Sequence, residues 1–326
     1  MRRSGWLGFV IASTVLFGAE KNPPSAVDPN QIGSTDQPEF HAGDKGSGVA
    51  RAQILLARAH FSCGQIDGNF GTNLEKTVTA FQQERKLPVT GNVDAATWAV
   101  LNTDLAPLLI PYTVSEDDEK GPFVQVPKDM MRQAALPYLG YSSPLDELAE
   151  RFHSSGDLLK ALNPQADFSA PGTQLTVPNV LVMPPEGAGA AAQVVVSKSE
   201  CSVRAYDRQG KLVAFYVATI GSTHDPLPLG DWKIEGVKRD PVFHYDAALF
   251  WDAKDKNDRT EIKPGPRNPV GLVWIDLSKE HYGIHGTPDP SLIGHTFSHG
   301  CIRLTNWDAL ELAGMVKPGM AAVLKD

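Results

Sequence analysis

The hydrophobic period of the chain changes once, near residue 193, and this change limits what the whole sequence can fold into. Before it, apolar residues recur every three or four positions, which is typical of amphipathic helices. After it, apolar and polar residues alternate or form short β-branched runs, which is typical of strands. A chain of 326 residues has room for two or three domains. The sequence therefore predicts a multidomain protein with helical N-terminal parts and a mainly-β C-terminal domain.

The charge balance of the chain excludes some classes of partner. Lys plus Arg number 30 and Asp plus Glu number 38, which gives a net charge of −8. A nucleic acid or an anionic membrane surface is bound by a basic face, so we expect neither as a dominant partner. Hydrophobic residues make up 42% of the chain, which is ordinary for a globular protein with a buried core.

The N-terminus has the pattern of an export signal. Arg2 and Arg3 precede an apolar run from Trp6 to Ala19, which is shorter than the roughly 20 residues that cross a bilayer. The pattern predicts a signal peptide over residues 1–19 and an exported protein in the periplasm or cell wall. Phe17 is too large for the usual cleavage pattern, so an uncleaved membrane anchor is the alternative. Residues 20–43 are rich in Pro, Ser, Asp and Gly and are predicted to be a flexible tether.

Residues 44–103 are predicted to be a compact three-helix unit. Leu55 lies on the first helix, Phe81 on a second that starts near Thr72, and Trp98 on a third, for which Asp94 can be the N-cap. The string "IDGNFGTNLEKTVTAFQQERKLPVTGNVDAATWAVL" resembles the three-helix peptidoglycan-binding module of many cell-wall enzymes. That resemblance implies binding to the cell wall.

Residues 112–180 allow two interpretations. The pieces "YTV", "LDELAERF", "DLLKALNP" and "GTQLTVP" resemble a lysin motif, a small βααβ module that binds glycan, with a long insertion after the first strand. The alternative is a helical spacer with no ligand of its own. Linker-like composition precedes this region over residues 103–122 and follows it from Pro184 to Ala192.

The region from residue 193 onward is predicted to be mostly strands. Val194 to Val196 form a β-branched run, and Leu212 to Ile220 are apolar on both faces, as in a buried central strand. Asp252 to Pro269 are polar and rich in Pro and Gly, which predicts a long loop. One hypothesis makes this loop a lid over the active site, and the alternative is a solvated loop.

A dense group of reactive side chains lies near the C-terminus: His285, His295, Ser298, His299, Gly300, Cys301 and Arg303. A cysteine nucleophile attacks as its thiolate, so it needs a base or a lowered pKa. His285, at the end of a strand, could reach Cys301 from a neighbouring strand, and the carbonyl of Gly286 could fix its tautomer. Backbone N–H groups of Gly300 and Cys301 could stabilise an oxyanion.

Two other interpretations of this group are open. A zinc site would use His285, His295, His299 and Cys301, but their spacing matches no closed zinc module and no Glu is placed as a base. A structural interpretation makes Cys301 a small buried hydrophobe with histidines nearby. The three cysteines are an odd number, so at least one thiol is left unpaired. Cys201 is expected to lie on a strand with its side chain in the hydrophobic core, and Cys63 is expected beside a turn.

The string "IHGTPDPSLIGHTFSHGCIRLTNWDALEL" resembles the signature of the L,D-transpeptidase catalytic domain, and the resemblance covers residues 193–326. It implies a mainly-β, β-sandwich-like domain that needs no metal and no organic cofactor. The resemblance implies Cys301 as nucleophile, His285 as base and the Gly286 carbonyl as its orienter, with His299 and Gly300 completing the catalytic motif. Arg303, Ser298 and Asn306 are expected to bind substrate, and Asn306 also to support the last helix.

The resemblance implies a peptidoglycan L,D-transpeptidase that forms 3→3 cross-links between stem peptides through a cysteine acyl-enzyme. Its partners would be stem peptides and glycan strands. The same acyl-enzyme would also serve an L,D-carboxypeptidase or an enzyme that attaches proteins to peptidoglycan. Two further classes are a papain-like or NlpC-like cysteine hydrolase, which places its Cys before its His, and a wall-binding protein without catalysis. The order of His285 and Cys301 argues against the hydrolase.

Overall fold

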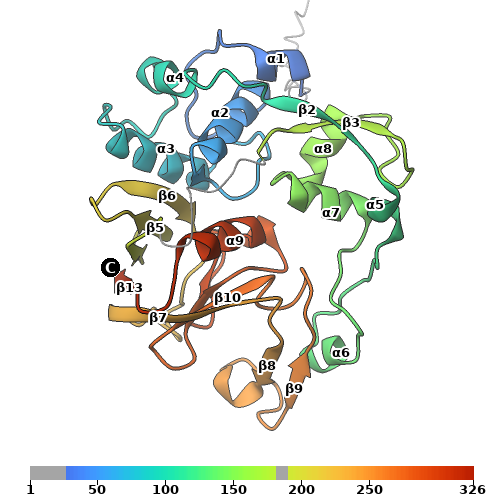
Figure 1. Cartoon of the computed structure of the whole chain (residues 1–326), viewed down its shortest axis with the longest axis vertical. Coiled ribbons are helices and arrows are strands. Elements are labelled where there is room, and N and C mark those ends of the chain that lie inside the picture. The colour runs from blue at the N-terminus through green and yellow to red at the C-terminus, as the bar shows by residue number, and fades with distance from the viewer. Residues whose placement is uncertain (1–26, 181–189) are drawn as a thin grey trace, which may run out of the picture.

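The structure is a computed structural model that describes residues 27–180 and 190–326. The predicted signal peptide, residues 1–19, and most of the predicted linker from Pro184 to Ala192 lie outside the described residues. Figure 1 shows helices α2 to α4 at the upper left, the β2–β3 pair with α7 and α8 at the upper right, and the strand-rich domain below them. Within the two described ranges, every helix is too short or too polar to cross a membrane.

The N-terminal part consists of helices whose apolar faces share one core. These helices are α1 (Pro29–Gly33), α2 (Ser47–Arg58), α3 (Thr72–Glu84) and α4 (Ala95–Leu101). Asp94 is the N-cap of α4, as predicted, and its side chain accepts a hydrogen bond from the N–H of Thr97. The flexible tether predicted over residues 20–43 is wrong for α1. Ile32 is fully buried there, and Arg51 donates to its carbonyl at 2.8 Å.

The second part has the strand–helix–helix–strand order of the resemblance. Its elements are β2 (Leu109–Thr113), α5 (Glu116–Lys120), α6 (Met130–Ala134), α7 (Pro144–Arg151), α8 (Gly156–Leu162) and β3 (Gln174–Pro178). Strands β2 and β3 pair antiparallel, with Ile110 opposite Val177. Leu148 and Phe152 of the α7 region pack against this pair. The insertion after β2 contains α5 and α6. The lysin-motif assignment itself stays a prediction.

The C-terminal domain is mainly β, as predicted, and most of its strands join one sheet. Among the described residues, nine strands follow the order β1-β6-β5-β4-β13-β7-β10-β11-β12. They are β1 (Phe61–Ser62), β4 (Gln193–Ser197), β5 (Ser202–Tyr206), β6 (Leu212–Val217), β7 (Gly230–Arg239), β10 (Val273–Leu277), β11 (Gly283–His285), β12 (Ile302–Arg303) and β13 (Ala321–Lys325). Helix α9 (Asn306–Met315) packs on β10 and β11.

A separate hairpin stands beside this sheet. Strands β8 (Phe243–Asp246) and β9 (Arg259–Ile262) pair antiparallel, and the 3-10 turn η1 (Ala247–Leu249) follows β8. A second such turn, η2 (Pro290–Leu292), precedes the Cys301 loop. The loop predicted from Asp252 to Pro269 is therefore wrong over β9, where the fully buried Ile262 anchors the strand.

The helical part contributes a strand to the nine-stranded sheet. Strand β1 lies parallel to β6, with Phe61 opposite Phe215 and Ser62 opposite Tyr216. The rings of Phe61 and Phe215 stack at 6.3 Å between centroids. Strand β6 is buried on both faces because Phe215 packs in the core of the helical part and Tyr216 in the core of the C-terminal domain. The prediction of a buried central strand is confirmed here.

The insertion of the second part reaches across to the β8–β9 hairpin, and we call residues 122–143 the arm. Helix α6 packs on β9, and Figure 1 shows it beside this hairpin. The N–H of Leu139 donates to the carbonyl of Pro264 at 3.3 Å, and the N–H of Arg267 donates to the carbonyl of Leu139 at 2.9 Å. A Cβ on Gly265 would lie 2.3 Å from the Leu139 oxygen, so only glycine permits this close docking.

Candidate active site

Strands β11 and β12 bring the candidate catalytic residues to one face of the sheet. They pair in parallel, with Ile284 opposite Ile302 and His285 opposite Arg303. Both isoleucines are fully buried in the core of the domain. Because side chains alternate along a strand, His285 and Arg303 point to the opposite face, and Cys301, two residues before Arg303, lies on that same face.

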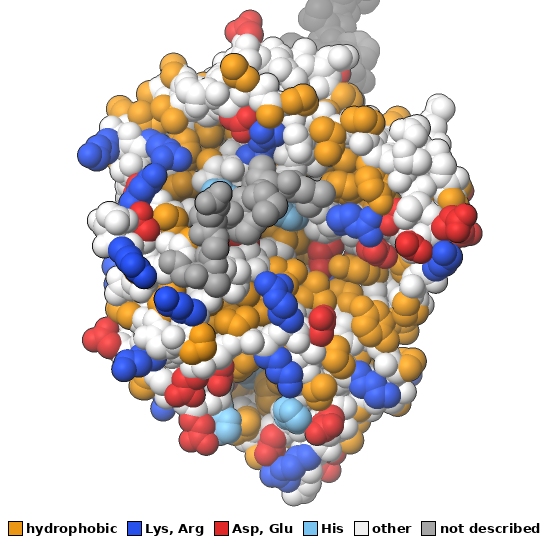
Figure 2. All heavy atoms as spheres, viewed as in Figure 1, with side chains coloured by type: hydrophobic (Ala, Val, Ile, Leu, Met, Phe, Trp, Pro, Cys, Tyr) orange, Lys and Arg blue, Asp and Glu red, His pale blue; other side chains and the backbone are white. Residues whose placement is uncertain are grey.

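These three residues line a cleft of about 1140 Å³. Ligand sites commonly enclose roughly 300–1,000 Å³, so the cleft has room for a peptide substrate. Its walls come from the segment after β8, from the strand ends around the thiol and from the arm. On the face shown in Figure 2, acidic and basic side chains are interspersed rather than gathered by sign.

His285 is held as a neutral ring with one defined tautomer. Its Nδ1 lies 2.7 Å from the carbonyl oxygen of Gly286. A carbonyl can only accept, so Nδ1 carries the hydrogen and Nε2 keeps a free lone pair. The ring stacks on Trp274 at 5.3 Å with an interplanar angle of 16°. Burial lowers the pKa of His285 to about 3, and the nearby charge of Arg303 acts in the same direction. The ring is therefore an uncharged base at neutral pH.

Cys301 is a free thiol that is partly buried and lines the cleft. Its Sγ donates to the carbonyl of His281 at 3.6 Å, and the structure has no hydrogen bond between Cys301 and His285. Burial raises the pKa of the thiol, while the N–H of Gly283 and the charge of Arg303 oppose this effect. The resting site is thus a neutral thiol beside a neutral imidazole. Catalytic hydrogen bonds of this kind often tighten only when substrate binds.

The residues before the thiol shape its loop. Gly300 has a φ of +102°, and a Cβ there would lie 2.8 Å from the ring of Tyr282, so the position requires glycine. The Nε2 of His299 lies 2.9 Å from Oδ1 of Asp252 in the predicted lid, and the ring contacts Phe250. His299 therefore joins the thiol loop to the segment after β8. The lid hypothesis stays a prediction.

Arg303 lines the cleft, and no carboxylate among the described residues pairs with its guanidinium. Its Nε is buried and has no hydrogen-bond partner in the described part of the chain. Burial lowers its pKa, and a negative charge on Cys301 would raise it. A guanidinium forms its strongest hydrogen bonds with a carboxylate, often through two parallel N–H groups. Arg303 is therefore suited to a carboxylate brought by the substrate.

The structure places Ser298 and Asn306, which are also expected to bind substrate, away from the cleft. Ser298 is 3% exposed, its hydroxyl donates to the backbone carbonyl of Cys301 and its N–H donates to the carbonyl of Ile220 at 3.0 Å. Asn306 is 1% exposed and lies under the turn at Gly286. Neither side chain lines the cleft, because their polar atoms are already used to hold loops together.

The four proposed zinc ligands do not converge. His285, His299 and Cys301 line the cleft, but His295 is exposed in the turn after η2 and does not line it. Over residues 27–180 and 190–326, no three His, Cys, Asp or Glu side chains are arranged to hold a metal ion.

Cys201 is less buried than expected, since it precedes β5 in a turn with a φ of +49°.

Sequence reasoning missed several residues that line the cleft. Trp274 and Tyr282 lie beside His285 and Cys301, and Trp274 is the register partner of His285 across β10 and β11. The alternation of β10 carries a signal for Trp274, since it separates Trp274 from the buried Val273 and Ile275. The arm adds four more lining residues from another part of the chain: Lys128, Asp129, Met130 and Met131. Only the length of the insertion marked the arm in the sequence.

Comparison with known proteins gives a family for each of two segments. Residues 191–324 match the family described as the YkuD L,D-transpeptidase catalytic domain. Residues 45–101 match the family described as a peptidoglycan-binding domain.

Individual relatives carry the same description over part of their length. The L,D-transpeptidase YkuD of Bacillus licheniformis is 36% identical over 127 residues, which cover 39% of this chain and 61% of the relative. The L,D-transpeptidase YbiS of Escherichia coli K12 is 28% identical over 189 residues, which cover 55% of this chain and 59% of the relative. The chain thus spans about three fifths of the length of these relatives.

A solved L,D-transpeptidase structure from Xylanimonas cellulosilytica aligns with 88% of this chain and 98% of its own, at 14% identity and a TM-score of 0.39. A score this low adds nothing to the assignment, which follows from the matches in sequence. Residues 191–324 are therefore similar to an L,D-transpeptidase catalytic domain, in agreement with the mainly-β architecture, and residues 45–101 are similar to a peptidoglycan-binding domain.

Proposed function

We propose that this protein is an exported peptidoglycan L,D-transpeptidase that works through a cysteine acyl-enzyme. One observation carries the proposal. A neutral His285, whose Nδ1 hydrogen is directed at the Gly286 carbonyl, and the Cys301 thiol line the same cleft, which has room for a peptide. The family match of residues 191–324 supports the same reaction.

Acylation begins with transfer of the thiol proton to His285. The lone pair on Nε2 accepts the proton of the Cys301 thiol as Sγ attacks the carbonyl carbon of the third residue of a stem peptide. The N–H groups of Gly300 and Cys301 stabilise the oxyanion, in a loop whose shape depends on Gly300 and His299. The amide C–N bond then breaks, His285 returns the proton to the leaving amine, and the terminal D-Ala departs.

Transfer to the second stem peptide reverses these proton movements. A side-chain amine of the acceptor attacks the thioester carbon and gives a proton to Nε2 of His285. The C–S bond breaks, the thiolate takes that proton back, and a new amide joins the third residues of two stems. No metal or organic cofactor takes part in either half of this scheme.

Arg303 supplies the fixed charge of the site. Its unpaired guanidinium binds a carboxylate of the donor stem and places the scissile carbonyl at Sγ. The same positive charge stabilises the thiolate while it forms, which offsets part of the penalty that burial places on a charged thiol.

The other parts of the chain keep the enzyme at its polymer. The domain over residues 45–101 binds peptidoglycan, which raises the concentration of stem peptides near the cleft. The basic and apolar N-terminus directs export, so the protein works in the periplasm or cell wall.

Intact-protein mass spectrometry with a disaccharide-tetrapeptide tests this function. The wild-type chain is expected to gain the mass of the acyl group. D-Ala should be released from the substrate, and a cross-linked dimer should form. The Cys301→Ala variant is the matched control and should gain no mass. An adduct that yields only tripeptide product would assign the chain to the L,D-carboxypeptidases. A folded wild-type chain without adduct or product would refute the acyl-enzyme.

A further inference from the structure

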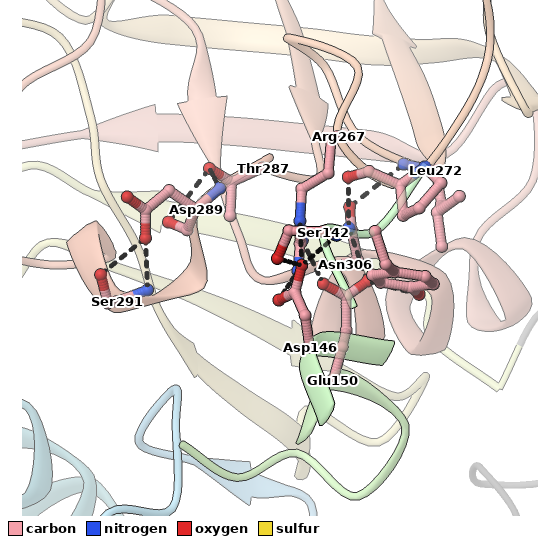
Figure 3. A network of polar contacts seen from close by, with 11 residues as sticks. Ser142, Asp146, Glu150, Arg267, Leu272, Thr287, Asp289, Ser291 and Asn306 are labelled. Atoms are coloured by element: carbon pink, nitrogen blue, oxygen red, sulfur yellow. Dashed lines mark hydrogen bonds and ion pairs between the residues drawn. The ribbon is translucent and has the colours of Figure 1, made fainter. Parts of the chain in front are cut away.

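A buried carboxylate of the second part faces the catalytic domain. Glu150, on α7, is 7% exposed and points toward Arg267 and Asn306, as Figure 3 shows. Its Oε2 accepts from Nη1 of Arg267 at 2.6 Å. Its Oε1 accepts from Nδ2 of Asn306 at 2.8 Å and from the hydroxyl of Tyr141 at 3.1 Å. Both oxygens are thus occupied, and two of these three bonds cross between the parts of the chain.

These bonds decide which way the amide of Asn306 points. A carboxylate only accepts hydrogen bonds, so Glu150 must face the NH₂ end of the amide. The carbonyl of Pro266 accepts from the same nitrogen at 3.1 Å. The amide oxygen is then directed to the opposite side, where it accepts from the N–H of Leu272 at 3.1 Å.

The oxygen of Asn306 lies against the turn that holds the histidine. A Cβ on Gly286 would come within 2.1 Å of this oxygen, and a Cβ on Gly271 within 2.0 Å, so both glycines pack directly on it. Gly286 is also the residue whose carbonyl accepts from Nδ1 of His285 at 2.7 Å. A chain of direct contacts therefore runs from Glu150 through Asn306 to the histidine.

We propose that Glu150 is a positioning residue for His285. By fixing the amide of Asn306, it fixes the Gly286 turn, and the Gly286 carbonyl in turn keeps the hydrogen on Nδ1 and the lone pair on Nε2. The inference rests on the proposed function, in which His285 is the base. It makes the second part of the chain a component of the catalytic apparatus, whether or not that part also binds glycan.

The same interface offers a matched control in Asp146. This residue lies one turn before Glu150 on α7 and accepts from Nη2 of Arg267 at 2.5 Å. Its carboxylate also accepts from Nε of Arg267 at 3.4 Å and from the backbone N–H and hydroxyl of Ser142. Asp146→Ala therefore removes a carboxylate from Arg267 but leaves the partners of Asn306 in place. Glu150→Gln keeps an oxygen for Asn306 while it removes the charge.

Steady-state kinetics with the tetrapeptide donor separate positioning from docking. Glu150→Ala is expected to lower kcat about tenfold, the lower end of the loss known for removal of groups that orient metal-bound histidines. Its KM should stay within about twofold, because no group that contacts substrate has changed. Glu150→Gln and Asp146→Ala should keep kcat within about threefold of the wild type. This pattern would support the proposal.

Nitrogen NMR of His285 gives a second readout that does not depend on turnover. Glu150→Ala should change the Nδ1 and Nε2 shifts of this ring, whereas Asp146→Ala should leave them as in the wild type. Unchanged shifts in Glu150→Ala would overturn the proposal, as would equal losses of kcat and melting temperature in Glu150→Ala and Asp146→Ala. If the wild type does not turn over the donor, the proposed function fails, and the NMR comparison still decides the role of Glu150.

Discussion

The rate at which iodoacetamide alkylates Cys301 should rise about tenfold for each pH unit between pH 6 and pH 8. Only the thiolate reacts, so the rate follows the thiolate fraction. The ordinary pKa of the thiol is 9.0, and burial raises it in this site. At pH 7 the thiolate fraction is therefore below about one in a hundred, and each added pH unit multiplies it by ten.

His285 does not form a charged pair with the thiol, so it leaves the pH dependence of the alkylation rate unchanged. Its pKa of about 3 leaves about one ring in ten thousand protonated at pH 7. A preformed thiolate–imidazolium pair would behave differently, because its thiolate would be complete well below pH 7 and the rate would be flat from about pH 5 to pH 8. The two charge states thus predict rate profiles of different shape.

Intact-mass measurement of the alkylated fraction over time provides the assay. The Cys301→Ala variant reports the background from Cys63 and Cys201, which are also free thiols. A His285→Gln variant should show the same slope as the wild type, since the neutral ring does not ionise the thiol at rest. A plateau below pH 8 in the wild type that disappears in His285→Gln would refute the neutral pair.

Three further predictions concern residues around the site. Gly300→Ala should lower kcat/KM about a hundredfold with D-Ala release as the assay, because φ of +102° and the Tyr282 ring both oppose a Cβ; near wild-type turnover would contradict this. Met131→Ala should raise KM about fivefold at constant kcat, because it removes apolar surface from the arm wall of the cleft; an unchanged KM would exclude contact with substrate. In the wild type, the free energy of unfolding should fall as pH rises from about 4 to 8, and in Asp308→Asn this fall should be smaller, as measured by urea denaturation. Burial raises the pKa of Asp308 to about 8, so the folded state keeps a proton that the unfolded state releases, and stability falls by up to about 1.4 kcal/mol per pH unit as pH rises; equal slopes in both proteins would contradict this.

The local part of the site could be predicted from the sequence because it depends on spacing along two short strands. Cys301 and Arg303 are two residues apart at the start of β12 and both line the cleft, and the residue after His285 supplies the carbonyl that accepts from its ring. The buried strand β6 was predictable for the same reason, since both of its faces are apolar. Each of these features is set by neighbours within a few positions.

The remaining contacts join residues that are distant along the chain. Glu150 meets Asn306 across 156 positions, and nothing in the sequence around either residue marks the other. The same amide that holds the Gly286 turn could equally have faced a substrate, because Asn suits both roles. The position of the arm could not be predicted from the sequence for a related reason. Its docking depends on backbone hydrogen bonds of Leu139, which any residue type except proline could make at that position.

The pairing of β1 with β6 predicts that the catalytic domain depends on the helical part. Without residues before 190, β6 becomes an edge strand and exposes Phe215 and Val217, which are fully buried in the whole chain. Each such side chain contributes roughly 1.5–3 kcal/mol through burial, so the loss is a large part of a typical domain stability of about 5–15 kcal/mol. An exposed apolar edge also favours association with other chains. A fragment of residues 190–326 should therefore aggregate in size-exclusion chromatography and melt well below the full chain. A monomeric fragment with the melting temperature of the full chain would show that the β1 contact contributes little.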